Sequence, residues 1–379
     1  MTKKIIDYIK LRDYDRPTLI IDVDQVEENY RRFKKGMPHA HVHYAIKANP
    51  HPYILERLVS IGCKFDCASI GEIKDCLDAG ANPADISFGN TIKRWQDIKD
   101  AYELGIRLFA ADSRQELDKI SLYAPNSEVF IRIIIHSTEA EWPLSRKFGC
   151  SSSKVLPLMD YAVEKELIPV GISFHVGSQT RHPHMWHDSL DAVSHVWHQC
   201  KDAGHNLTVL NIGGGFPAQY PNSDITEIEE YGASVSAAIK ERFGDVEYIM
   251  AEPGRGLVGN TGCIVAEVLL VSKKHDEDPV RWVYLNIGRF HGLAETEKEA
   301  IKYQITRIND LDQESEGSEC ILAGPTCDSA DILYEDHKMI FPNDLKWGDK
   351  VIIHNCGAYT TTYSSVNFNG IPPLRVIAI

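Results

Sequence analysis

Short apolar runs alternate with longer amphipathic segments from about residue 40 to residue 255. The runs are Val42–Ile46, Cys63–Asp66, Ile86–Phe88, Ile106–Ala110, Val129–Ile135, Gly171–His175, Leu207–Ile212 and Glu247–Glu252. Each run is too short for a helix and is rich in β-branched or aromatic residues, which is typical of strands. The segments between them, such as Tyr53–Ile61 and Ser153–Lys165, carry Leu, Ile, Val and Ala at helical spacing. The pattern therefore predicts parallel strands joined by helical crossovers.

The number of runs bears on how these strands are arranged. Eight repeats of strand and helix are the number found in a (β/α)8 TIM-like barrel, so the count favours a closed barrel. A doubly wound open sheet is the alternative, because periodicity alone does not distinguish the two arrangements. We expect an α/β fold class with the barrel as its first large domain.

The pattern changes after Gly259. The runs Cys263–Val271, Trp282–Ile287, Cys320–Leu322, Lys350–His354 and Leu374–Ile379 are strand-like, with few helical stretches between them. A chain of 379 residues is also longer than a barrel of about 250 residues requires. We therefore predict two domains: an α/β barrel at residues 24–260, and a mainly β domain, either a β-barrel or a sandwich, made of residues 1–23 plus 261–379.

Composition and charge narrow the class of partner. The formal net charge of −14 disfavours nucleic acid or an anionic membrane, because both present negative charge, and it is compatible with a small cationic substrate. No apolar run approaches the roughly 20 residues of a membrane span, and the charged N-terminal segment lacks the apolar core of a signal peptide. The nine cysteines show neither a C-x-x-C pair nor zinc-type spacing. We expect a cytoplasmic protein without a metal site.

Two of the barrel runs end in side chains that could take part in catalysis or cofactor binding. Lys47 ends the first run, and a lysine at the carboxyl end of a barrel strand can be partly desolvated and form a Schiff base. A lysine that merely marks an exposed strand end is the plainer alternative. His175 ends the sixth run and could stack on a flat aromatic cofactor, while Ser178 could bond its phosphate. A lone strand-end histidine is, however, more often structural.

Two glycine-containing motifs follow the last two barrel runs. Gly213, Gly214 and Gly215 would let the backbone approach a phosphate closely, although a glycine triplet is more often only a tight turn. The chain has no G-x-G-x-x-G, so a Rossmann dinucleotide site is not supported. In the sequence Ala-Glu-Pro-Gly-Arg-Gly, Glu252 could keep a pyridine nitrogen protonated and Arg255 could pair with phosphate. The alternative is a surface ion pair beside a Pro-Gly turn.

The second domain contains two irregular segments of small residues, Gly324–Asp331 and Cys356–Tyr359. Such segments commonly carry reactive side chains on loops. Cys327 could donate a proton, and Asp328 could bind the ammonium group of a substrate. A buried cysteine beside a solvated aspartate turn is the alternative.

Taken together and in order, these motifs resemble the fold-type III pyridoxal-phosphate decarboxylases, the group of ornithine, lysine, diaminopimelate and carboxynorspermidine decarboxylases that is related to alanine racemase. The resemblance extends from about Tyr44 to Gly370, nearly the whole chain. It implies a pyridoxal 5'-phosphate cofactor, an N-terminal α/β barrel and a C-terminal β domain. It also implies a head-to-tail homodimer with active sites at the interface.

The resemblance assigns roles to individual residues. It implies that the catalytic residues are Lys47 as the Schiff-base lysine, His175 stacked on the ring, Glu252 at the pyridine nitrogen and Cys327 as a proton donor. The implied cofactor-binding residues are Lys47, Asp66, Arg132, His175, Ser178, Gly213, Gly214, Gly215, Glu252, Gly254, Arg255 and Tyr359, with Glu72 near the lysine. The implied substrate-binding residues are Cys327, Asp328 and Glu295, with Asp328 reaching the distal amine from the neighbouring subunit.

The same resemblance bears on the substrate. Asp328 after the cysteine favours an ornithine-type enzyme, because diaminopimelate decarboxylases usually have Cys-Glu there. The segment Asn286–Glu297 departs from the eukaryotic ornithine decarboxylases, which supply a second aspartate for the distal amine, and looks closer to a bacterial subgroup. Glu295, Glu297 or another residue could replace it. We expect conversion of L-ornithine to putrescine in polyamine biosynthesis; lysine/ornithine, carboxynorspermidine and diaminopimelate decarboxylation are the alternatives.

Two rival functions share the implied fold. An amino-acid racemase usually has an arginine at the pyridine nitrogen, so Glu252 disfavours that function. A catalytically silent homologue that regulates a true decarboxylase is the rival from a different class. The presence of both Lys47 and Cys327 argues against it.

Overall fold

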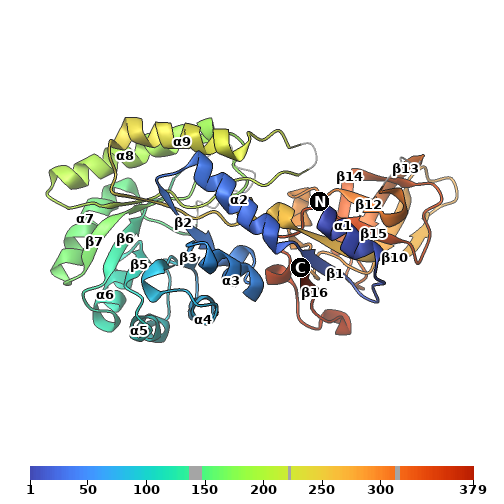
Figure 1. The fold of residues 1–379 in the computed structure, drawn as a ribbon, viewed down its shortest axis with the longest axis horizontal. Coiled ribbons are helices and arrows are strands. Elements are labelled where there is room, and N and C mark those ends of the chain that lie inside the picture. The colour runs from blue at the N-terminus through green and yellow to red at the C-terminus, as the bar shows by residue number, and fades with distance from the viewer. Residues whose placement is uncertain (136–146, 221–222, 312–315) are drawn as a thin grey trace. The chain divides into compact units, whose positions relative to one another are not determined.

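The computed structural model describes residues 1–135, 147–220, 223–311 and 316–379. The packing of the chain divides it into two compact units (Figure 1). We call residues 27–217 plus 224–257 the barrel unit, and residues 1–26, 218–223 and 258–379 the sheet unit.

Among the described residues, eight parallel strands close into a barrel in sequential order. They are β2 (Ala40–Ala45), β3 (Lys64–Cys67), β4 (Ile86–Phe88), β5 (Leu108–Ala111), β6 (Glu128–Arg132), β7 (Ile168–Ser173), β8 (Val209–Asn211) and β9 (Tyr248–Ala251). Strand β2 pairs with both β3 and β9, which closes the ring. Each of the eight predicted runs corresponds to one of these strands. The TIM-like barrel is therefore confirmed, and the open doubly wound sheet is excluded.

Helices alternate with the barrel strands along the chain (Figure 1). They are α2 (Val23–Gly36), α3 (Pro52–Ser60), α4 (Ile70–Asp78), α5 (Trp95–Glu103), α6 (Arg114–Tyr123), α7 (Ser152–Glu164), α8 (His187–Asp202) and α9 (Ile228–Phe243), followed by the single turn α10 (Arg255–Val258). Helix α3 is capped by His51, whose side chain accepts from the backbone N–H of Tyr53, and the helix buries Ile54, Leu55 and Leu58. This helical face is the one that the spacing of apolar residues predicts.

Several barrel strands supply apolar side chains to a common core. Val170, Val209 and Met250 form a buried cluster, with Leu108 and Tyr248 packed against it. These five residues come from β7, β8, β9 and β5. Apolar packing within the barrel leaves the carboxyl ends of the strands as the place where polar side chains gather.

The sheet unit is built on a mixed sheet that has eight strands in the described part of the chain. The strands are β1 (Thr18–Ile21), β10 (Gly262–Ser272), β11 (Arg281–Leu285), β12 (Ile305–Arg307), β13 (Gly317–Ala323), β14 (Ile332–Pro342), β15 (Lys350–Ile353) and β16 (Arg375–Ala378). Their order is β12-β15-β10-β11-β13-β14, and β1 pairs with β10 and β16. The five predicted runs of this region correspond to β10, β11, β13, β15 and β16, whereas β1, β12 and β14 were not predicted.

The N-terminal segment packs onto this sheet. Helix α1 (Lys3–Lys10) begins at Thr2, whose side chain accepts from the N–H of Ile5, and it buries Ile5 and Ile9. Those two side chains share a core cluster with Ile20 of β1. Since β1 pairs with β16, the two ends of the chain contribute neighbouring strands to one sheet.

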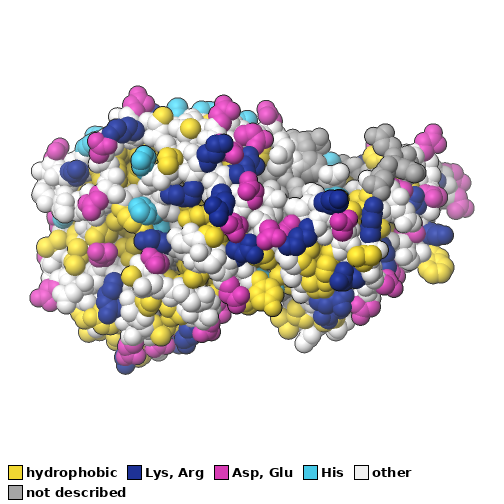
Figure 2. All heavy atoms as spheres, viewed as in Figure 1, with side chains coloured by type: hydrophobic (Ala, Val, Ile, Leu, Met, Phe, Trp, Pro, Cys, Tyr) yellow, Lys and Arg dark blue, Asp and Glu magenta, His cyan; other side chains and the backbone are white. Residues whose placement is uncertain are grey.

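Charged side chains of both signs are interspersed on the face of the molecule shown in Figure 2. The net negative charge is therefore not gathered into one patch on that face. Within the described residues, none of the helices has the length and apolar composition needed to cross a membrane.

Candidate active site

Five candidate residues occupy the carboxyl ends of the barrel strands. Lys47 lies in the 3-10 turn Ile46–Ala48 directly after β2, and Asp66 lies on β3. Arg132 is the last residue of β6, His175 follows β7 and Glu252 directly follows β9. Because the strands of the barrel are parallel, their carboxyl ends meet at one rim. The structure thus brings together residues that are up to 205 positions apart in the sequence.

Two acidic groups share this rim with two cations. Burial raises the pKa of Glu252 to about 7, and the nearby charge of Asp66 adds to the rise. Burial likewise raises the pKa of Asp66. The positive charges of Lys47 and Arg132 oppose the rise at both carboxyls. The rim is therefore an electrostatically coupled cluster, in which the protonation of one acid depends on the other.

The Glu252 carboxyl is held in place by Asn211 at the end of β8. The amide Nδ2 of Asn211 donates to Glu252 Oε1 at 2.6 Å, and its Oδ1 accepts from the N–H of Gly213 at 2.8 Å. The N–H of Glu252 donates to the carbonyl of Gly213 at 2.8 Å. Asn211 therefore fixes the acid relative to the glycine turn. It was missed from the sequence, where a polar residue that ends an apolar run directly before three glycines was the available signal.

The imidazole of His175 has a defined tautomer. Its Nδ1 accepts a hydrogen bond from the N–H of Gly177 at 2.9 Å, so the neutral ring carries its proton on Nε2. Burial, reinforced by the charges of Arg132 and Lys47, holds the pKa of His175 well below its ordinary value. The ring is therefore neutral near pH 7. A Cβ placed on Gly214 would lie 3.4 Å from Nε2, which puts this ring edge against the glycine turn.

The turn Gly213–Gly215 has no room for side chains. Gly213 and Gly215 have φ angles of +67° and +104°, which glycine adopts far more readily than other residues. A Cβ on Gly213 would lie 2.2 Å from the carbonyl oxygen of Phe174, and one on Gly215 would lie 2.4 Å from that of Gly177. The turn is thus pressed against the loop that carries His175 and Ser178, so both candidate phosphate-binding elements lie side by side.

Asp66 and Glu72 have different local roles. Asp66 is 6% exposed and accepts from the hydroxyl of Ser87 at 3.1 Å. Glu72 accepts from the N–H of Ala68 at 2.6 Å, while its own N–H donates to the Ser69 hydroxyl. This reciprocal pattern resembles a capping box at the start of α4. Burial raises the pKa of Glu72 as well, and the Lys47 charge opposes that rise.

Lys47 is exposed, whereas its neighbours Ile46 and Ala48 in the same 3-10 turn are buried. Its charge still acts on Asp66, Glu72, Glu252 and His175. Gly254 and Arg255 lie where α10 begins, and both are buried. The barrel unit thus contains every predicted cofactor residue except Tyr359.

The remaining candidates belong to the sheet unit. Cys327 and Asp328 are exposed on the loop between β13 and β14, whereas the other eight of the nine cysteines are buried. The buried-cysteine alternative for Cys327 is therefore wrong. Tyr359 is half-buried and has a φ of +54°, and Glu295 is half-buried on the 3-10 helix Ala294–Glu299.

The loop that carries Cys327 is anchored by Asp331, which is 3% exposed. One carboxylate oxygen accepts from the N–H of Arg289 at 2.8 Å, and the other accepts from the N–H and hydroxyl of Thr326 at 3.1 and 2.8 Å. The N–H of Cys327 donates to Asn369 Oδ1 at 3.0 Å. Sequence reasoning missed Asp331 and Asn369 as anchors. The second aspartate of the Cys-Asp-Ser-Ala-Asp sequence was a signal for the first, and none marked the second.

The sequence of this chain is similar to those of known enzymes. The sequence profile described as pyridoxal-dependent decarboxylase, pyridoxal binding domain, matches residues 23–259. A lysine/ornithine decarboxylase of Selenomonas ruminantium is 32% identical over 357 residues, which cover 93% of this chain and 87% of that protein. An ornithine decarboxylase of Schizosaccharomyces pombe is 31% identical over 369 residues, covering 94% and 82%.

A solved structure shows the same architecture. The lysine/ornithine decarboxylase of Vibrio vulnificus, crystallised with cadaverine, superposes with a TM-score of 0.88 at 30% identity, covering 100% of this chain and 99% of that one. The profile match spans more than half of the chain, and its bounds contain the entire barrel rim described above. The expected family and cofactor are thereby confirmed. This chain belongs to the pyridoxal-dependent decarboxylases.

Proposed function

We propose that this chain decarboxylates a basic amino acid with pyridoxal 5'-phosphate, and that its substrate is L-ornithine, which it converts to putrescine for polyamine biosynthesis. The observation that carries the proposal is the Glu252 carboxyl, held by Asn211 at the same barrel rim as Lys47. An acid at this position can keep a pyridine nitrogen protonated, which decarboxylation requires. A racemase of this fold usually has an arginine there.

The barrel rim fits the cofactor. A backbone turn without side chains, Gly213–Gly215, adjoins the loop of His175 and Ser178, and this is the kind of surface that receives a phosphate group. We propose that the cofactor is held by Lys47, Asp66, Arg132, His175, Ser178, Gly213, Gly214, Gly215, Glu252, Gly254, Arg255 and Tyr359. When bound, pyridoxal phosphate supplies a conjugated ring that accepts the electron pair left at Cα as carbon dioxide departs.

The side chains of the rim have separate tasks in this proposal. Lys47 Nζ is the covalent attachment point, and its exposure leaves the amine accessible. Glu252 keeps the ring nitrogen protonated, and Asn211 holds the Glu252 carboxyl in position. His175 presents a neutral, flat imidazole suited to stacking, because its pKa lies well below the ordinary value. Because the imidazole is neutral, the positive charge of Arg132 does not repel it.

The loop anchored by Asp331 supplies the groups that we assign to the substrate. Asp328 binds the distal ammonium, and the Cys327 thiol returns a proton to Cα after carbon dioxide has left. The Vibrio vulnificus relative has been crystallised with cadaverine and with putrescine, which supports a cationic amino acid as substrate here. Glu295 is the candidate for the second carboxylate at the distal amine, and Glu297 is the alternative. Because the segment that carries both residues lacks the family's second aspartate, lysine or a longer basic amino acid is the alternative substrate.

We further propose that the working form is a homodimer in the cytoplasm, with active sites at the subunit interface. The exposure of Cys327 and Asp328 supports this proposal, because reactive groups on a surface loop are available to a second subunit. As functional domains we propose residues 24–260 for the cofactor-binding barrel, and residues 1–23 plus 261–379 for the β domain. A silent regulatory homologue is the other candidate, which the retained Lys47 and Cys327 disfavour.

A substrate panel tests the function. Purified protein loaded with pyridoxal phosphate is incubated separately with L-ornithine, L-lysine, L-arginine, meso-diaminopimelate, carboxynorspermidine and D-ornithine, and carbon dioxide and amine are measured. We expect the highest kcat/KM with L-ornithine. The preference over L-lysine, which is one methylene longer, should be about 10- to 200-fold. Equal use of both would identify a dual enzyme, and a cofactor-loaded protein that releases no carbon dioxide from any substrate would refute the proposal.

Replacing the acid at the ring nitrogen tests its role. Glu252→Gln preserves the shape of the side chain and can still accept the hydrogen bond from Asn211, but it removes the negative charge. We therefore expect kcat to fall on the order of 100-fold, which is the typical loss when one electrostatic partner is removed at a reacting centre. Cofactor retention, read from the absorbance of the desalted protein, should persist. Glu128→Gln, at the exposed amino end of β6, is the matched control and should leave kcat unchanged. Full turnover in Glu252→Gln would contradict the assignment.

A third experiment addresses the proton donor. Cys327→Ala should lower kcat by about 100-fold or more, because positioned proton transfer contributes this much. It should also divert part of the product, since the proton can then be delivered elsewhere. Ser329→Ala on the same exposed loop is the control. Steady-state rates and product analysis decide the matter, and an unaltered rate and product in Cys327→Ala would remove Cys327 from the mechanism.

A further inference from the structure

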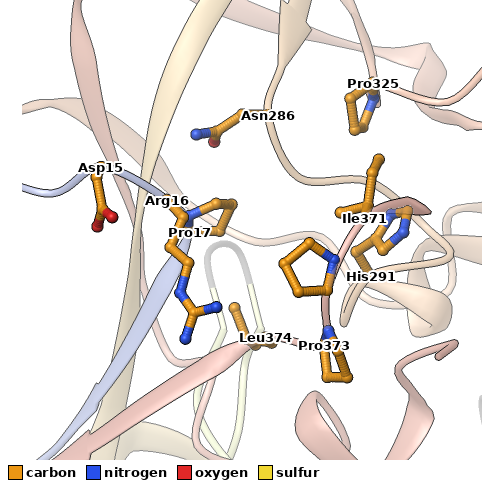
Figure 3. Close-up of a pocket in the computed structure, with 10 residues that line it drawn as sticks. Asp15, Arg16, Pro17, Asn286, His291, Pro325, Ile371, Pro373 and Leu374 are labelled. Atoms are coloured by element: carbon orange, nitrogen blue, oxygen red, sulfur yellow. The ribbon is translucent and has the colours of Figure 1, made fainter. Parts of the chain in front are cut away.

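The sheet unit contains a cavity of about 250 Å³ that none of the assigned cofactor or substrate residues lines (Figure 3). Its walls include Arg16, Asn286, His291, Pro325, Ile371 and Leu374. An apolar protein cavity of about 150 Å³ is large enough to bind benzene. The space in the sheet unit therefore accommodates a single ring that carries a small substituent.

One wall of the cavity includes the buried side chain of His291. His291 is 2% exposed, and neither Nδ1 nor Nε2 has a hydrogen-bond partner among the described residues. A neutral imidazole has one N–H donor and one acceptor nitrogen, and leaving them unpaired in the interior is unfavourable. Figure 3 shows the ring beside Ile371 at the cavity. A ligand with a hydrogen-bonding group would satisfy it.

The charge of the cavity selects the sign of that group. Asp15 also lines the cavity, and its carboxylate is already paired with Arg375, whose Nη1 lies 3.0 Å from Asp15 Oδ1. The half-buried Arg16 also lines the space, and within the described residues its guanidinium makes no ion pair. The remaining wall is mainly proline and aliphatic, as Pro325 and Leu374 illustrate. The lining thus combines the cation of Arg16, the imidazole of His291, the amide of Asn286 and an Asp15 carboxylate that is paired with Arg375 with a mainly apolar surface.

We propose that this cavity is a binding site for a small carboxylate with an aromatic or branched apolar body. The carboxylate lies toward Arg16 and His291, and the apolar body packs against the proline and aliphatic wall. Carboxylates pair favourably with guanidinium groups and accept from an imidazole N–H. The basic amino acids of the proposed reaction carry an additional ammonium group, for which this lining offers no unpaired acid among the described residues.

The position of the cavity links it to the loop of the proposed proton donor. Pro325 precedes Cys327 by two residues, and Ile371 follows Asn369 by two. The N–H of Cys327 donates to Asn369 Oδ1 at 3.0 Å. A ligand that contacts Pro325 and Ile371 therefore touches both segments that set the Cys327 backbone. Occupancy of the cavity is therefore expected to alter the reactivity of the Cys327 thiol; only the effect of that change on catalysis rests on the proposed function.

Binding is tested on the full-length, cofactor-loaded protein by titration with benzoate, and with benzyl alcohol as the neutral comparison, using calorimetry or ligand-observed NMR. We expect saturable benzoate binding that Arg16→Met weakens at least tenfold and that excess putrescine does not displace. Benzyl alcohol binding should be insensitive to Arg16→Met. The control Arg12→Met removes an exposed arginine outside the cavity and should change neither affinity. His291→Leu should weaken both probes, since it removes the hydrogen bond.

The link to Cys327 has a readout that requires no turnover. Cys327 is the exposed cysteine, so iodoacetamide alkylates it selectively and mass spectrometry follows the rate. Saturating benzoate should change this rate at least threefold in the native chain and leave it unchanged in Arg16→Met. An unchanged rate in the native chain would overturn the link.

Two results would overturn the site itself. One is the absence of saturable binding of either probe, which would mean that the cavity holds only water. The other is benzoate affinity that survives both Arg16→Met and the cavity-filling Ile371→Trp, which would place the ligand elsewhere. Intact benzoate binding in a protein that decarboxylates none of the tested amino acids would count against the proposed function and leave this site standing.

Discussion

The candidate active site depends on one electrostatic constraint, which is that two acids and two cations lie close together at the rim of a parallel barrel. Asp66 and Glu252 are both buried enough that their pKa values rise, and each makes the other harder to ionise, while Lys47 and Arg132 draw both back toward the charged form. Such a cluster is costly unless its members are fixed by hydrogen bonds. Asn211 and Ser87 provide those bonds to Glu252 and Asp66. Glu252 makes no ion pair with the described residues, so a protonated nitrogen in this rim would supply it with an opposite charge in direct contact.

In the sheet unit, hydrogen bonds fix the backbone of the exposed loop that carries Cys327 and Asp328. Asp331 accepts three hydrogen bonds from Arg289 and Thr326, and Asn369 accepts one from Cys327. The glycines flanking this anchor are constrained as well, because a Cβ on Gly324 would lie 2.3 Å from the Asp331 carboxylate. Cys327 and Asp328 are thus exposed at their side chains and fixed at their backbone. That combination suits groups which meet a substrate held by another part of the enzyme.

The sequence predicted the barrel because its signal is local and repeated: all eight strands are short apolar runs, and the residues at their ends, such as Lys47 and Glu252, are visible as polar endings. Strand β14 was not predicted because its residues mix charged and apolar types without a regular period, and its pairing with β13 contains register shifts. Asn211 and Asp331 left weak local signals, but their bonds to Glu252 and Arg289, like the bond of Asn369 to Cys327, join residues 41 or 42 positions apart and are settled only by tertiary structure. The burial of the His291 ring without a partner among the described residues likewise leaves no trace in the sequence.

The central claim, that the barrel rim binds pyridoxal phosphate through Lys47, is tested most directly by chemical trapping. The protein is loaded with the cofactor, reduced with borohydride, digested and examined by peptide mass spectrometry. The account predicts one phosphopyridoxyl group per chain, located on Lys47, and its loss in Lys47→Arg, which keeps the charge and removes the reactive amine. A label carried by Lys64 or Lys93 in place of Lys47, or undiminished labelling of the Lys47→Arg protein, would contradict it.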